Sequence, residues 1–217
     1  MHREGLGIIL AFFSAAVVMT LIVLASGGGV SLNVLLVFLW LLTLFSIYFF
    51  RDPNRAIPDN ENAILSPADG KVIEISEADE PEYLKTKTRK ISVFLNVFDV
   101  HVNRCPIGGE VKFFRYQKGR FLRAYLKEAS YKNEQTIIGI SQGKRQVVFK
   151  QIAGLIARRI SCDLREGHKV KTGERMGIIK FGSRVDVFMP LDVEVKVVIG
   201  DRVAGGVSIL GVFQDVS

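Results

Sequence analysis

The sequence contains few residues of the kinds that cross-link a chain or bind a metal ion. Its 217 residues include two cysteines and three histidines. Cys105 and Cys162 form no CxxC pair, and two isolated thiols are no disulfide framework, so we expect both to be reduced, as in a cytoplasmic domain. The histidines are spread along the chain without the spacing of zinc ligands, which argues against a metal site.

Charge is missing from two long apolar runs near the N-terminus, residues 6–25 and 30–50. Each run is long enough to cross a hydrocarbon core of roughly 30 Å as a helix. The Ser-Gly-Gly-Gly segment between them favours a tight antiparallel connection. We therefore predict a transmembrane hairpin that forms a membrane anchor over residues 1–50. The alternatives are a hairpin that never reaches the far leaflet and, for the first run, a signal peptide.

Basic residues flank the predicted anchor. Arg3 precedes the first run, and Arg51 and Arg55 follow the second, so both ends of the hairpin are predicted to face the cytoplasm, at the inner face of the cell membrane. The formal net charge of +7 raises the alternative of a nucleic-acid partner. Because the basic residues are dispersed and form no reader motif, we expect none. The run 85–90 fits contacts with anionic headgroups, or a solvated basic face.

The rest of the chain, residues 51–217, has the pattern of one mainly β domain. Short β-prone segments alternate with Gly, Pro and charged turns. A turn at 165–174 that contains His168 is similar to the hairpin of biotinyl and lipoyl carrier barrels and is expected at the surface. The predicted fold class is a β-rich α+β catalytic domain with such hairpins. One short helix is expected within 119–132, and strands are expected at 70–76, 90–97, 110–116, 136–141, 146–151, 157–162, 176–181, 184–189, 193–199 and 206–211.

Gly182 and Ser183 lie between two of these predicted strands. A serine hydroxyl beside an unhindered glycine carbonyl has the geometry for an internal acyl shift. Attack of Ser183 Oγ on the Gly182 carbonyl would give an ester. Elimination would then break the chain and leave a dehydroalanine, which loses ammonia to become an N-terminal pyruvoyl group. A simple turn is the alternative for such a pair, and the pair alone does not decide between the two.

Four sequence blocks decide it. They are FRDPNR at 50–55, SPADGKV at 66–72, NVFDVHVNR at 96–104 and FGSRVD at 181–186. In this order they resemble the phosphatidylserine decarboxylase proenzymes, in particular their short form. The resemblance implies autocatalytic cleavage between Gly182 and Ser183, giving a large chain 1–182 and a small chain 183–217 that stay associated. It also implies a pyruvoyl cofactor made from Ser183, with neither a metal nor pyridoxal phosphate.

Two further residues join Ser183 in the predicted site. Asp69 lies in a tight turn, where aspartate often bonds only its own backbone. His101 follows an apolar strand, where a histidine is commonly a hydrogen-bonding residue. A serine nucleophile, however, needs a base to take its proton, and a carboxylate can orient that base. With the resemblance, we predict Asp69, His101 and Ser183 as the self-processing set.

The chain departs from part of the family at Arg104. Some long bacterial relatives carry a second histidine three positions after the one that matches His101, and this chain has Arg104 there. His101 would then serve both self-processing and decarboxylation, or Arg104 would hold an anion. Arg51, Arg55 and Arg104 are the candidate phosphate ligands, and each could instead pair with a carboxylate such as Asp52 or Asp99.

The resemblance implies decarboxylation of phosphatidylserine to phosphatidylethanolamine and carbon dioxide, through a Schiff base between the pyruvoyl ketone and the substrate amine. Two other classes stay open. One is the same chemistry on another substrate, either an archaeal-type ether lipid with a serine headgroup or a soluble amino acid, against which the membrane hairpin argues. The other is a membrane-anchored β-barrel adaptor without catalysis, which has no reason to break at Gly182. The sequence leaves acyl-chain preference and homo-oligomerisation open.

Overall fold

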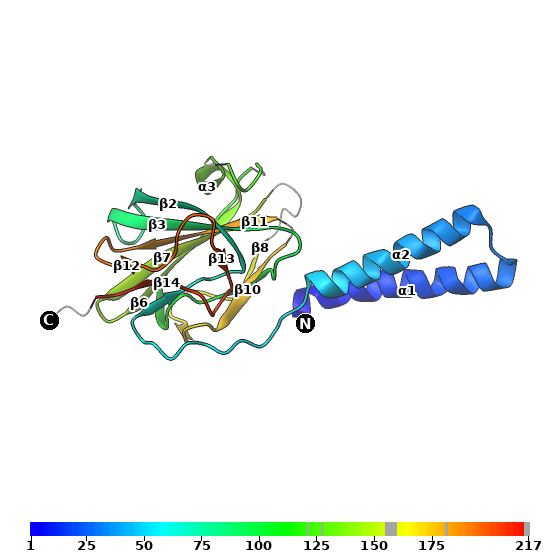
Figure 1. Cartoon of the computed structure of the whole chain (residues 1–217), viewed down its shortest axis with the longest axis horizontal. Coiled ribbons are helices and arrows are strands. Elements are labelled where there is room, and N and C mark those ends of the chain that lie inside the picture. The colour runs from blue at the N-terminus through cyan, green and yellow to red at the C-terminus, as the bar shows by residue number, and fades with distance from the viewer. Residues whose placement is uncertain (121, 127, 155–159, 181, 215–217) are drawn as a thin grey trace. The chain divides into compact units, whose positions relative to one another are not determined.

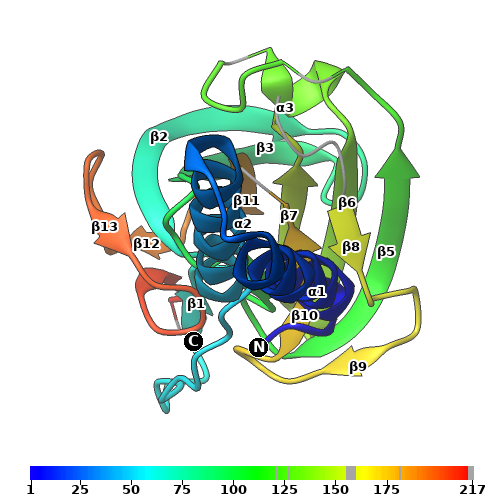
Figure 2. The ribbon, with the colours of Figure 1, turned by 90° about the vertical axis from the view of Figure 1, so that its right-hand side faces the viewer.

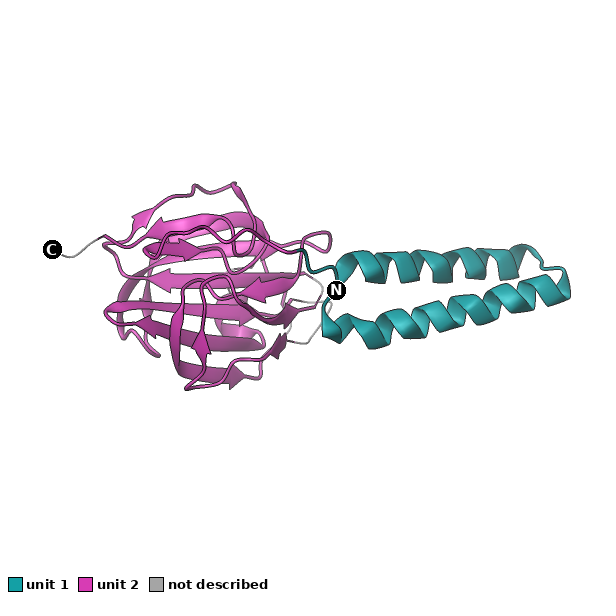
Figure 3. Ribbon diagram, turned by 90° about the horizontal axis from the view of Figure 1, so that it is seen from below, with its two compact units in different colours: residues 1–53 teal, residues 54–217 magenta. Residues whose placement is uncertain are grey.

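The computed structural model describes residues 1–120, 122–126, 128–154, 160–180 and 182–214, in two compact units, residues 1–53 and 54–217 (Figures 1 and 3). The first unit holds helices α1 (Arg3–Ser26) and α2 (Val30–Phe49). The second holds one short helix, α3 (Ala129–Lys132), and β1 (Ala63–Leu65), β2 (Gly70–Glu80), β3 (Thr86–Leu95), β4 (Val102–Arg104), β5 (Gly109–Gln117), β6 (Gln135–Gln142), β7 (Arg145–Ile152), β8 (Ile160–Cys162), β9 (Lys169–Val170), β10 (Arg175–Ile179), β11 (Ser183–Met189), β12 (Glu194–Val195), β13 (Arg202–Val203) and β14 (Ile209–Val212).

The two helices of the first unit run antiparallel against each other (Figure 3). α1 ends at Gly27, whose left-handed φ of 75° suits a residue without Cβ. Trp40 of α2 donates its indole N–H to Thr20 Oγ1 at 3.4 Å and stands edge-on to the ring of Phe13. Both helices are long and apolar enough to cross a membrane, by length and composition. The prediction of two N-terminal apolar helices that can form a hairpin is confirmed.

The second unit is built on an eight-stranded antiparallel sheet with the order β13-β2-β3-β11-β7-β6-β5-β9. Figure 2 shows how strongly this sheet curls. Two three-stranded sheets, β4-β10-β8 and β1-β14-β12, complete the unit. The main hydrophobic core includes Val93, Phe149 and Val185 from the large sheet and Met176 and Ile179 from β10. The prediction of a mainly β domain is confirmed.

One end of the large sheet gathers the ends of four of its strands. β11 begins at Ser183, which lies opposite Leu95, the last residue of β3. β6 begins at Gln135, which lies opposite Ile152, the last residue of β7. Because β11 and β7 are antiparallel neighbours, these positions lie at the same end of the sheet. We call it the Ser183 end.

Most predicted strands are present with shifted ends, and the short helix predicted within 119–132 is α3. The strand predicted at 193–199 is wrong beyond β12, because the chain turns where the Asp201 carboxylate accepts the N–H of Val198. The strand predicted at 206–211 begins only at Ile209, because Gly206 has a φ of 74°. Residues 157–159 and 181 of two other predicted strands lie outside the described residues.

Candidate active site

Ser183 is the first residue of the central strand β11 and is fully buried. Its Oγ is buried without a hydrogen-bond partner among the described residues. Gly182, just before it, has a φ of 61°, a left-handed conformation that favours glycine. A buried hydroxyl that no other group binds is costly for the fold, and such groups are found where chemistry needs them. The residues at 182 and 183 thus fit a chain-derived cofactor whose precursor is this hydroxyl.

The carbonyl of Gly182 faces the backbone of Gly154. A Cβ added at Gly154 would lie 1.8 Å from the Gly182 oxygen and 3.6 Å from Cβ of Ala124. Only a residue without a side chain therefore leaves room for the carbonyl in this position. No sequence pattern indicates this contact, because residues 154 and 182 are brought together only by the pairing of β7 with β11.

His101 is fully buried directly before β4. Its Nδ1 lies 2.9 Å from the carbonyl oxygen of Asp99, so Nδ1 carries the proton and Nε2 is the basic nitrogen. The carbonyl of His101 accepts the N–H of Ile179 at 3.4 Å. His101 is therefore placed beside the end of β10, and β10 is the strand that precedes Gly182 in the chain.

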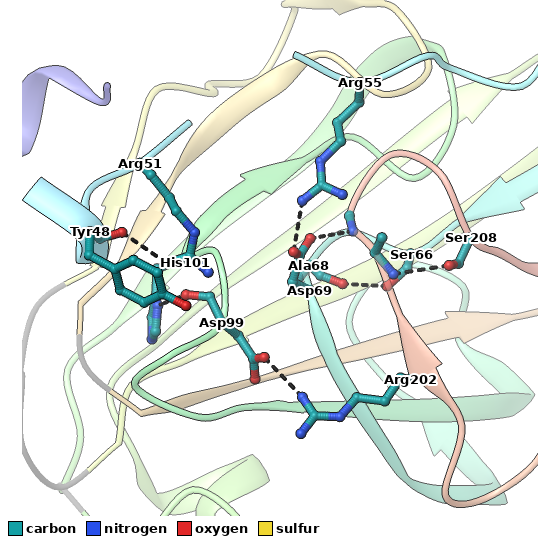
Figure 4. A network of polar contacts seen from close by, with 12 residues as sticks. Tyr48, Arg51, Arg55, Ser66, Ala68, Asp69, Asp99, His101, Arg202 and Ser208 are labelled. Carbon is teal, nitrogen blue, oxygen red and sulfur yellow. Dashed lines mark hydrogen bonds and ion pairs between the residues drawn. The ribbon is translucent and has the colours of Figure 1, made fainter. Parts of the chain in front are cut away.

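Asp69 is held in the turn between β1 and β2. Its carboxylate accepts a hydrogen bond from the guanidinium of Arg55 at 2.8 Å and another from the backbone N–H of Gly205 at 2.7 Å. Figure 4 shows the Asp69 side chain directed toward Arg55. Ser66 supports the turn by donating to the carbonyl of Ala68 at 2.7 Å. Arg55 thus has a carboxylate partner, but that partner is Asp69 and neither Asp52 nor Asp99. Asp99 instead pairs with Arg202 at 3.0 Å.

Arg104 is almost fully buried and donates to the carbonyl of Gly173 at 3.0 Å. A Cβ at Gly206 would lie 2.6 Å from Cδ of Arg104, so the glycine makes room for this side chain. Together with Arg55, Arg104 lines a cavity of about 660 Å³. The other lining residues are Asn54, Ile57, Lys171, Thr172, Gly173, Glu174 and Arg175. Four cations against one carboxylate in this lining favour an anionic ligand.

Arg51 belongs to the helical unit. Its guanidinium lies 3.9 Å from the centre of the Tyr48 ring and donates to the Tyr48 carbonyl at 2.8 Å. His168 is exposed in the turn before β9, as expected for a surface histidine. The basic run 85–90 is largely paired with β2, since Lys87 bonds Glu77 at 3.0 Å and Lys90 bonds Glu74 at 2.9 Å.

Arg184, the residue after the candidate nucleophile, has a role that the sequence reasoning missed. Its side chain is 1% exposed and bonds the fully buried Asp186 at 2.5 Å, Glu74 at 2.9 Å and the Ser92 hydroxyl at 2.7 Å. Asp186 also accepts the hydroxyl of Ser130 at 2.7 Å. The sequence could have indicated this ion pair, because an Arg and an Asp lie two residues apart within an otherwise apolar strand.

A second missed feature is a chain of hydrogen bonds between buried polar side chains. Thr136 donates to Gln151 at 2.7 Å, and Gln151 donates to Asn103 at 2.8 Å. Asn103 Nδ2 is buried and has no hydrogen-bond partner within the described part of the chain. Thr136 and Gln151 pair across β6 and β7, and Val185 of β11 lies opposite Gln151. Polar groups thus extend from β4 to the large sheet near the start of β11.

Both cysteines are free thiols. Burial raises the pKa of Cys162 to about 11, and it raises the pKa of Cys105 further. Both therefore stay protonated and unreactive at neutral pH. Among the residues that the structure describes, no group of three or more His, Cys, Asp or Glu side chains could hold a metal ion.

Comparison with known proteins gives one consistent result. Residues 42–211 match the family model described as phosphatidylserine decarboxylase. A protein of Carboxydothermus hydrogenoformans named phosphatidylserine decarboxylase proenzyme is 45% identical over 97% of this chain and 95% of its own length. Proteins with the same name from Desulfotalea psychrophila and Syntrophus aciditrophicus are 42% and 51% identical, over 96% and 79% of this chain and 94% and 81% of their own lengths.

Proposed function

The chain belongs to the phosphatidylserine decarboxylase family and is a carboxy-lyase, and from this premise we propose that it converts phosphatidylserine to phosphatidylethanolamine and carbon dioxide. We further propose that it first cleaves itself between Gly182 and Ser183 into chains 1–182 and 183–217. The observation that carries the proposal is the buried hydroxyl of Ser183, which has no hydrogen-bond partner among the described residues and directly follows a glycine with left-handed φ.

Cleavage starts when Ser183 Oγ attacks the carbonyl carbon of Gly182. His101 Nε2 takes the hydroxyl proton, and the amide nitrogen of Ser183 leaves as the new amine when the ester forms. Loss of the α-proton of residue 183 then expels the Gly182 carboxylate from Cβ and leaves a dehydroalanine. Its enamine tautomerises to an imine, and one water molecule hydrolyses this imine to a ketone and ammonia.

Once formed, the pyruvoyl group would supply a ketone that can condense with the substrate amine, with loss of water, and so provide an electron sink for the loss of carbon dioxide. The side chains around it have simpler tasks. His101 Nε2 returns a proton to the substrate carbon, so one histidine serves both self-processing and decarboxylation.

Asp69 is the third member of the proposed set. Its carboxylate is fixed on one side by the N–H of Gly205 and on the other by Arg55. To orient the imidazole of His101 during self-processing, Asp69 must exchange Arg55 for the histidine, and His101 Nδ1 must release the carbonyl of Asp99. We propose that this exchange precedes cleavage.

The substrate phosphate is the anion proposed for Arg51, Arg55 and Arg104. The last two line the basic cavity of the β unit, where Lys171 and Arg175 add positive charge. The proposed location is the inner face of the cell membrane, with residues 51–217 in the cytoplasm. The two apolar helices support membrane association, and Arg3 and Arg51 at their ends favour this orientation.

The test is an activity assay in detergent, with phosphatidylserine labelled at its serine carboxyl group. The wild type and the surface variant His168→Ala are expected to release labelled carbon dioxide, whereas Ser183→Ala and His101→Ala release none. Release of labelled carbon dioxide only from the ether-linked lipid would replace the proposed substrate but leave the proposed decarboxylation chemistry unchanged. An uncleaved wild-type protein without activity on either lipid would overturn the proposal in favour of an adaptor.

A further inference from the structure

The segment 118–134 connects β5 to β6 and contains α3, and its described residues, 118–120, 122–126 and 128–134, form a compact arch. Its two legs are joined by backbone hydrogen bonds from Arg120 to Lys132 and from Glu134 to Arg120. The side chain of the fully buried Asn133 hydrogen-bonds both to the first half of the arch and to the residue after β7. Its Oδ1 accepts the N–H of Leu122 at 2.9 Å, and its Nδ2 donates to the carbonyls of Leu122 and Ala153, each at 2.8 Å. These contacts give the arch a fixed position.

That position is the Ser183 end of the large sheet, beyond the ends of β6 and β7 at the top of Figure 2. One part of the arch packs near Gly154, which also faces Gly182. Ala124 is 4% exposed, and its Cβ and the carbonyl oxygen of Gly182 both lie against Gly154. The ring of Tyr125 meets that of Phe94 on β3 edge-on, with 6.3 Å between centroids.

The arch also carries exposed aromatic, apolar and basic side chains. Tyr125 is 50% exposed, Leu126 is 41% exposed and Tyr131 is 60% exposed. Arg123 donates to the Tyr125 hydroxyl at 2.9 Å. Three further exposed basic residues belong to the arch, namely Lys118, Arg120 and Lys132. Glu128, the one exposed acidic residue described in the arch, is paired with Lys132, so the surface is net basic.

Tyrosines and basic residues together are typical of protein surfaces at the headgroup level of a membrane. Positive charge there is attracted to anionic lipids. We propose that the exposed side chains of the arch dock onto the anionic surface of the bilayer, as a membrane contact separate from the apolar helices. The proposal rests on the proposed function, because a phospholipid keeps its acyl chains in the bilayer while its headgroup reaches residue 183.

The test uses tryptophans as depth probes in the full-length protein. Trp40, the single tryptophan, is first changed to phenylalanine, and Ser183→Ala keeps the chain uncleaved. Tyr125→Trp and Tyr131→Trp probe the arch. Leu191→Trp is the matched control, since Leu191 is 40% exposed and follows Met189 at the opposite end of β11. Each variant is placed in nanodiscs of phosphatidylglycerol with brominated acyl chains.

Loss of fluorescence is expected at positions 125 and 131 and not at 191, and the loss should shrink in brominated phosphatidylcholine. Equal fluorescence at all three positions in the brominated nanodiscs would overturn the docking proposal. A loss of fluorescence that occurs only when the protein self-associates in detergent would also overturn it. Because quenching needs no catalysis, it separates the two hypotheses. An active enzyme without arch quenching refutes only the docking, and arch quenching without any decarboxylase activity in the cleavable protein refutes only the function.

Discussion

At the residue scale, Arg184, the residue after the proposed nucleophile Ser183, lies in a buried network of ion pairs and hydrogen bonds. A guanidinium taken out of water is costly unless its partners replace the lost hydration. Arg184 has three such partners, in Asp186, Glu74 and Ser92. Two of them, Glu74 and Ser92, belong to the proposed large chain, while Arg184 and Asp186 belong to the small chain. The network therefore ties residue 183 to the rest of the fold across the proposed break.

Arg184→Met is expected to destabilise the protein by about 3 kcal/mol or more, because it leaves the Asp186 carboxylate buried without its cation. The measurement is urea unfolding of the β unit in the uncleaved Ser183→Ala background. Arg202→Met is the control, since the Arg202 side chain is 67% exposed and its ion pair with Asp99 should contribute about 0–1 kcal/mol. Equal losses in the two variants would show that the buried network does not stabilise the fold.

Cys162 gives a prediction about pH. Burial raises its thiol pKa from 9.0 to about 11, which lowers the thiolate fraction at pH 8 by roughly 100-fold. A Cys105→Ser protein should therefore react with iodoacetamide far more slowly when folded than in denaturant. The folded rate should rise steadily up to about pH 11. Intact mass against time measures it, and equal folded and denatured rates at pH 8 would contradict the burial of this thiol.

At this scale the sequence motifs indicated which residues could carry the chemistry. They did not indicate which side chains those residues would contact in the fold. Asp69, His101 and Ser183 could be selected because each lies in a family block. The partners of Arg184 could not, since Glu74 and Ser92 reach it only after β2, β3 and β11 pair. The roles of the three selected residues stay predictions, and the observed partner of Asp69 is Arg55.

At the scale of elements, the Ser183 end of the sheet depends on one close backbone approach. Gly154→Ala should push the Gly182 carbonyl away, because the added Cβ would lie 1.8 Å from its oxygen. Self-cleavage is expected to slow at least about tenfold, a barrier increase of roughly 1.4 kcal/mol. Cell-free synthesis followed by gel analysis over time measures the rate. Gly7→Ala is the control, since nothing lies within 4 Å of the added carbon, and equal rates for both variants would refute the steric argument.

Elements were predicted well where periodicity is strong and poorly where pairing is short. The apolar helices and the strands of the large sheet follow from long runs and alternation. β12 and β13 are short strands, Glu194–Val195 and Arg202–Val203, at the edges of their sheets. Their ends are set by turn contacts such as that of Asp201 with Val198, which alternation does not reveal.

At the scale of the whole molecule, strands of the proposed small chain pair with strands of the proposed large chain. β11 pairs with β3 on one side and with β7 on the other, β13 pairs with β2, and β14 pairs with β1. Breaking one peptide bond at Gly182 removes none of these strand pairings. The two chains of a cleaved protein are therefore expected to elute together from a sizing column in detergent and to separate only in denaturant. Separation without denaturant would contradict the topology.

Self-cleavage at Gly182 is the claim on which the account depends, and intact mass spectrometry tests it most directly. The purified wild type is compared with Ser183→Ala. We expect the variant to be a single chain of 24.2 kDa, apart from the one oxygen atom lost, whereas the wild type gives two chains. The smaller chain should begin at position 183 with a blocked N-terminus that reacts with ketone reagents. One intact chain in both proteins would contradict the account.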